Sequence, residues 1–106
     1  MAYDEGLLAR CLDALRAAGN TAVRTKNVFG MRGLLRGSTM FAAVGEDSMI
    51  VKTRADEFEA ALMRPGVRRF MPGGQTLGTW IELDQDAVAD DPDLREWLET
   101  ALRAIR

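Results

Sequence analysis

The stretch 27-NVFGMRGLLRGSTMFAAVG-45 decides the fold that we expect for this chain. Short runs of β-favouring residues alternate in it with glycine, and similar runs lie on either side. These features predict a meander of three or four antiparallel strands between residues 21 and 53. The connections are too short for the crossovers that parallel strands need. The stretch also holds four glycines and no acidic residue, so a phosphate loop, a nucleic-acid surface and simple turns all have to be considered.

Helical patterns flank this region on both sides. Apolar residues repeat at helical spacing over residues 4–18, where Asp4 can cap the first turn. A second helix is expected from Thr53, its predicted N-cap, to a stop at Pro65. A third helix is expected to begin at Asp91, its predicted cap, and to continue to the end of the sequence.

The remaining segment contains one more strand. Residues 67–75 read as an irregular connection, and residues 76–84 alternate as a half-buried strand. Leu77, Ile81 and Leu83 would share the buried face, with Trp80 on the other face beside two acidic residues. The fold class is therefore α+β in two layers. We expect one domain over residues 1–106, with an antiparallel sheet of about five strands and helices packed on it, in the order α-β(3-4)-α-β-α.

Composition limits the possible functions. The sequence contains no histidine and a single cysteine, which excludes histidine-based catalysis and an internal disulfide. Cys11 and Trp97 both fall in helical apolar stripes and are expected in the core. We expect no enzyme activity, no metal and no cofactor. No apolar run reaches the roughly 20 residues of a membrane span, and the acidic N-terminus differs from a signal peptide, so we expect a cytoplasmic protein.

The opening glycines do not fit a phosphate loop. The run from Gly30 to Gly33 lacks the GxxxxGK[ST] spacing, and it leads into further strands, whereas a phosphate loop leads into a helix N-terminus. Glycines at turns and bulges explain it better.

Basic residues suggest a contact surface. Arg24 and Lys26 share one strand face, and Arg32 and Arg36 share the alternate face of the next strand. If those faces coincide, four cations lie together and could attract a phosphate backbone or an acidic protein. A solvated strand face is the alternative. Trp80 is either an anchor for a partner or a ring covered by a loop such as 67–75.

Several of these residues resemble a known family, the N-terminal domain of the TfoX/Sxy regulators of bacterial competence. Phe29-Gly30 match the middle of the family's Met-Phe-Gly-Gly motif, with Val28 and Met31 replacing its first and last residues. Gly37, after Arg36, matches the following turn, and Met40-Phe41 match the next strand. The segments 48–62, 65–84 and 90–106 are similar to the rest of that domain, so the resemblance covers nearly the whole chain.

The resemblance implies a stand-alone domain without the family's C-terminal domain. It implies a non-enzymatic regulatory or adaptor role that acts through protein–protein contacts, with a transcription activator as the candidate partner. Two alternatives stay open. One is direct nucleic-acid binding by the basic strands, and the other is a small-ligand-binding domain. An exposed edge strand would also make a second copy of the chain a candidate partner.

Overall fold

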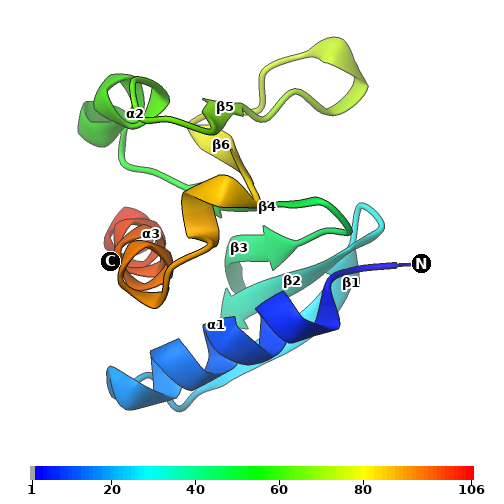
Figure 1. The fold of residues 1–106 in the computed structure, drawn as a ribbon, viewed down its shortest axis with the longest axis vertical. Coiled ribbons are helices and arrows are strands. Elements are labelled where there is room, and N and C mark those ends of the chain that lie inside the picture. The colour runs from blue at the N-terminus through cyan, green and yellow to red at the C-terminus, as the bar shows by residue number, and fades with distance from the viewer. Residues whose placement is uncertain (1) are drawn as a thin grey trace.

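The computed structural model describes residues 2–106 as three helices packed on one six-stranded antiparallel sheet (Figure 1). This confirms the predicted α+β class. The helices are α1 (Glu5–Ala17), α2 (Ala55–Leu62) and α3 (Asp91–Ala104), with short 3-10 turns η1 (Pro72–Gly74) and η2 (Asp86–Val88). The strands are β1 (Val23–Val28), β2 (Met31–Arg36), β3 (Thr39–Val44), β4 (Ser48–Lys52), β5 (Val67–Arg69) and β6 (Trp80–Asp84).

The strand order in the sheet is β1-β2-β3-β4-β6-β5. The first four strands form the predicted meander, and their tight turns place Phe29, Gly30 and Gly37 at positive φ. The first three residues of the segment expected to be irregular instead form β5, which pairs with β6. A strand of this length depends on its partner and leaves little pattern of its own in the sequence.

The helix ends confirm one predicted cap and correct two others. Asp4 accepts a hydrogen bond from the backbone N–H of Leu7 at 2.9 Å, as predicted. Thr53 does not cap α2, because its hydroxyl donates to the carbonyl oxygen of Thr79 at 2.8 Å. Helix α3 already includes Asp91, and Asp90 takes the cap position without a side-chain hydrogen bond. Expected and observed helix boundaries commonly differ by about one or two residues.

One face of the sheet carries the main core, where α1, α2 and α3 cover it (Figure 1). Cys11 and Trp97 are buried there, as predicted. Burial raises the pKa of the Cys11 thiol to about 12. Ile81 and Leu83 also face this core, whereas Leu77 is 37% exposed and precedes β6, so its predicted place in the core was wrong.

We call the other side of the sheet the open face, because no helix within residues 2–106 packs on it. Leu35, Ala43 and Ile50 are nevertheless buried on this side. Long side chains of the sheet itself provide part of the cover. A Cβ atom at Gly33 would lie 2.8 Å from the Met40 sulfur, so glycine at this position leaves room for the methionine.

In the described chain no helix combines the length and apolar character needed to cross a membrane.

Candidate interaction surfaces

The β1–β2 hairpin separates the four predicted cations into two pairs. Lys26 lies opposite Gly33 in the ladder and Asn27 lies opposite Arg32. Residues directly opposite each other in an antiparallel pair project from the same face of the sheet. Arg24 and Lys26 therefore project from the open face, whereas Arg32 and Arg36 project from the helix-covered face. The four cations do not form one patch, but they flank the strand β1 from both sides.

The three arginines of this set donate to neutral groups. Arg24 donates to the carbonyl oxygen of Gly37 at 2.8 Å. The Arg32 guanidinium reaches β1 and donates to Asn27 Oδ1 at 2.9 Å. Arg36 donates to Asn20 Oδ1 at 2.8 Å. None of the ion pairs formed within residues 2–106 involves Arg24, Lys26, Arg32 or Arg36. Their positive charges are therefore uncompensated by nearby carboxylates.

Several arginines elsewhere in the chain form ion pairs, whereas Arg95 and Arg106 form none within residues 2–106. Arg64 pairs with Glu96 and lies over the ring of Trp97, 4.4 Å from its centroid. Arg68 pairs with Glu82 at 3.4 Å on the open face. Between α2 and α3, Arg103 donates to Glu57 at 2.7 Å. This hydrogen bond lowers the pKa of the Glu57 carboxyl and raises the pKa of Arg103. These charges are already matched inside the fold.

Strand β1 is one edge of the sheet (Figure 1). It contains six residues, none of them fully buried. In the described part of the chain, its backbone forms ladder bonds with β2 and no other backbone–backbone bonds. Every second residue of an edge strand directs its N–H and C=O away from the sheet. The opposite edge differs, because β5 has only three residues.

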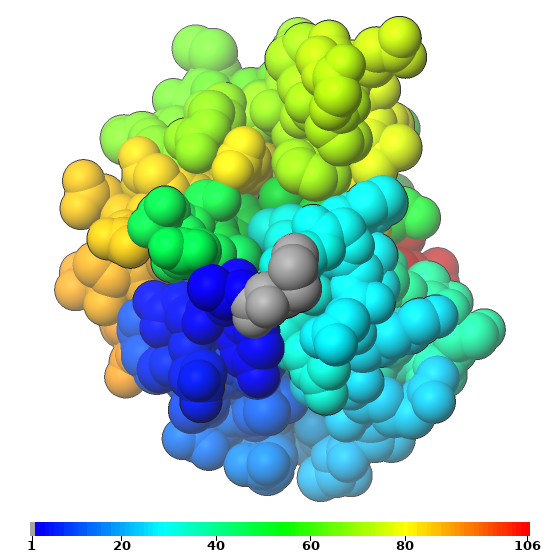
Figure 2. All heavy atoms as spheres, turned by 90° about the vertical axis from the view of Figure 1, so that its right-hand side faces the viewer, coloured from blue at the N-terminus to red at the C-terminus, as the bar shows by residue number. Residues whose placement is uncertain are grey.

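Phe29 occupies the turn at the end of β1. It has a φ of 56° and is followed by Gly30 with a φ of 75°. Two positive φ values in a two-residue hairpin loop are typical of a type I′ turn, whose first position suits asparagine, aspartate or glycine. Phenylalanine is strained there. Its side chain is also 65% exposed. The hairpin, cyan in Figure 2, emerges on this side of the molecule below the yellow-green segment that precedes β6.

Trp80 lies on the open face, on the side opposite Ile81 and Leu83, as the alternation predicted. Its side chain is half-buried, and Lys52 lies opposite it in β4. The preceding loop closes on its backbone, since Phe70 donates to the Trp80 carbonyl and the Trp80 N–H donates to Leu77. In the sheet, β2, β3 and β4 lie between β1 and β6, the strand that begins with Trp80. The two predicted contact regions are therefore separate.

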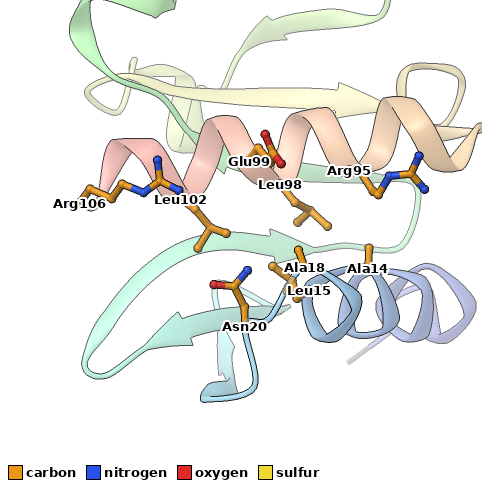
Figure 3. Close-up of a pocket in the computed structure, with 9 residues that line it drawn as sticks. All are labelled: Ala14, Leu15, Ala18, Asn20, Arg95, Leu98, Glu99, Leu102 and Arg106. Carbon is orange, nitrogen blue, oxygen red and sulfur yellow. The ribbon is translucent and has the colours of Figure 1, made fainter.

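Surface hollows with volumes between ≈ 110 Å³ and ≈ 490 Å³ lie on several sides of the molecule. The one in Figure 3 lies between α1 and α3, with a volume of ≈ 110 Å³. Leu15, Leu98 and Leu102 provide apolar lining, with Arg95 and Arg106 at its two ends. Pockets for drug-sized ligands usually measure about 300–1,000 Å³ and are lined mainly by apolar side chains. The hollow of ≈ 490 Å³ beside the Phe29 turn reaches this size, but its lining includes three carboxylates and an arginine. Residues 2–106 contain no group of three or more His, Cys, Asp or Glu side chains that could hold a metal ion.

Comparison with known proteins identifies the family. The family model described as the TfoX N-terminal domain matches residues 13–105. The chain belongs to the TfoX N-terminal domain family. Searches of the curated proteins and of the solved structures found no match.

Residues that carried the resemblance occupy defined positions in this TfoX N-terminal domain. Phe29 and Gly30 form the β1–β2 turn, and Gly37, with a φ of 62°, lies in the β2–β3 turn. Met40 faces Gly33 on the open face. The register shifts between Leu34 and Leu35, so that Phe41 lies between the paired residues and is fully buried in the core. The motif therefore includes both core and surface residues, and Phe29 is its exposed aromatic residue.

Sequence reasoning missed the edge position of β1 and the two asparagines that accept from Arg32 and Arg36. Strand order depends on long-range pairing that no short motif reports. The two-residue turn could have revealed the register, because it aligns Val28 with Met31 and thereby fixes every later pair.

Proposed function

We propose that this TfoX N-terminal domain is a non-enzymatic regulatory adaptor that acts in the cytoplasm through protein–protein contacts in transcription control. Membership of the family supports a regulatory role. The candidate partner is a component of the transcription machinery or an activator that works with it.

Phe29 is the observation that carries the proposal. Single exposed apolar residues are common on protein surfaces and need no special explanation. Phe29 is different because its exposed ring coincides with a strained backbone conformation in a turn that suits asparagine. Backbone strain of this kind clusters at positions that contact ligands or take part in switching. An aromatic ring is also a frequent anchor in protein interfaces.

The test is affinity capture from the organism's own lysate with and without nuclease, followed by mass spectrometry. The unmodified domain is compared with Phe29→Asn and with Met63→Asn, a matched change at another apolar side chain that is 85% exposed. We expect a nuclease-resistant transcription protein that Met63→Asn retains and Phe29→Asn loses. Capture that is unchanged by Phe29→Asn, or that disappears with nuclease, would contradict the proposal.

A second candidate function is direct nucleic-acid binding, which the uncompensated cations around β1 favour. Phosphate contacts make affinity fall steeply as salt rises. Binding of a DNA duplex at low salt, measured by fluorescence anisotropy and abolished by Arg24→Glu with Lys26→Glu, would support it. Absence of binding at low salt would eliminate it.

A further inference from the structure

We infer that the β1 edge is the docking site for an acidic, extended segment of a partner protein, which adds to the sheet as a further strand beside β1. This inference rests on the proposed function and specifies the chemistry of the partner. Two independent observations meet at this strand: an unpaired backbone edge and cations without carboxylate partners.

The backbone of β1 offers the binding mode. Six residues with outward N–H and C=O groups on every second position can form a ladder with an incoming peptide. Such main-chain bonds supply affinity without regard to sequence, and side chains on alternate positions supply the choice of partner. A phosphate backbone has no N–H groups with which to complete this ladder, so the edge favours a peptide.

The charges specify an acidic peptide. Side chains of an added strand would alternate between the two faces of the sheet. On the open face they would meet Arg24 and Lys26, both exposed. On the other face they would come near the Arg32 guanidinium, which reaches Asn27 of β1. Carboxylates on both sides of the added strand would therefore find positive charge without breaking an existing ion pair.

A second copy of the chain fits this edge poorly. In an antiparallel pair of two β1 strands centred on Thr25, Arg24 of each copy would lie opposite Lys26 of the other. Centring the pair on Lys26 would place the two lysines opposite each other. Like charges directly opposite in a ladder are destabilising, and basic residues on an edge are a common protection against self-association. The same charges that oppose self-pairing attract an acidic strand.

Phe29 defines one end of the docking site. It follows directly after Val28, the last residue of β1. An apolar residue at one end of the acidic segment would cover its exposed ring and fix the register of the added strand. The segment we expect is therefore acidic along β1 and apolar beside the turn.

The test is an NMR titration of the ¹⁵N-labelled domain with a synthetic peptide of consecutive Glu residues that ends in Leu and matches β1 in length. A peptide of consecutive Lys residues with the same end is the control. We expect the acidic peptide to shift the amide signals of β1 and of the Phe29–Gly30 turn, to slow hydrogen exchange in β1, and to bind less at higher salt. Equal effects of both peptides, or shifts that avoid β1, would overturn the inference.

Variants distinguish a loss of binding caused by the local charge from one caused by a change in the fold. Arg24→Glu with Lys26→Glu should weaken binding of the acidic peptide by about tenfold or more. Arg95→Glu in α3 with Arg106→Glu just after it, which changes the net charge equally, should leave the affinity within about twofold. Thr25→Pro removes a backbone donor from β1 and should also weaken binding while the remaining ladder keeps the domain folded. Equal losses in the two double variants would show a non-specific charge effect and overturn the inference.

The titration is repeated with a nucleic acid in place of the peptide. A single-stranded DNA that shifts the same β1 signals at concentrations where the acidic peptide does not would overturn the inference. Failure of the acidic peptide alongside Phe29-dependent capture of a transcription protein would reject this docking mode and leave the proposed function standing. Binding of the acidic peptide without any Phe29-dependent capture would support the docking mode and reject the proposed function.

Discussion

Lys26 lies directly opposite Gly33 in the β1–β2 ladder. This pairing places Lys26 and Arg24 on the open face, where a glycine and not another cation faces Lys26. It also moves Arg32 to the other face, one position along the ladder. The result is an edge strand with positive charge on both sides.

Phe29, in the turn after β1, is predicted to lower the stability of the fold and to contact the partner. Phe29→Asn should raise the free energy of unfolding by about 1 kcal/mol, because asparagine tolerates the positive φ of a type I′ turn better than phenylalanine does. Urea unfolding at equilibrium measures this change. The same variant should lose the captured partner. If Phe29→Asn destabilises the domain, the ring supports the fold and its exposure does not indicate a partner.

Gly33 is predicted to be required by the packing of the open face. Gly33→Ala should lower the free energy of unfolding by about 1–3 kcal/mol, because the new Cβ would lie 2.8 Å from the Met40 sulfur and 3.2 Å from the Lys26 carbonyl oxygen. Gly6→Ala is the matched control in α1, where the nearest atom would be 3.4 Å away. That change should raise stability by about 0.5 kcal/mol. Thermal unfolding of both variants compares the two signs, and a stabilising Gly33→Ala would contradict the packing.

The two tryptophans are predicted to respond differently to truncation. Trp97 is 2% exposed in the main core, so Trp97→Ala should lower the free energy of unfolding by about 3–5 kcal/mol. Trp80 is half-buried on the open face, and Trp80→Ala should leave the domain folded and weaken partner binding through a second contact region, separate from β1. Circular dichroism and capture on the same samples separate the two effects. Unfolding by Trp80→Ala would assign that ring to the fold alone.

Cys11 is predicted to make stability depend on pH in the alkaline range. Burial raises its pKa from 9.0 to about 12, so the unfolded chain loses this proton first as the pH rises. Stability is then fully present below the unfolded pKa and falls by about 1.4 kcal/mol per pH unit between these two values. Cys11→Ala should remove that part of the slope, which unfolding measurements on both proteins at several pH values can detect. Parallel pH profiles would contradict the assigned burial.

The sequence predicted the class of the fold because its signals are local. Asp4 begins a helix whose apolar stripe repeats regularly, and the glycine turns separate the strands of the meander. The short strand β5 and the Thr53–Thr79 hydrogen bond were missed, because both depend on partners far along the chain. Local patterns cannot report such contacts.

The sequence predicted which basic residues form the candidate surface, but not how the fold arranges them. The basic residues were identified, but their faces were not, because a turn formed by Phe29 and Gly30 is difficult to recognise when phenylalanine occupies a position that favours asparagine. Once Val28 is aligned with Met31, the split between the two cation pairs follows directly. The edge position of β1 required the complete strand order.

The most direct test of the account is amide hydrogen exchange of the domain bound to its captured partner, compared with the free domain. Docking at β1 predicts that protection rises in β1 and at Phe29, while β5 at the opposite edge of the sheet keeps its free-state exchange rates. Protection confined to β5, to Trp80 and its preceding loop, or to the helices would contradict it and place the contact surface elsewhere.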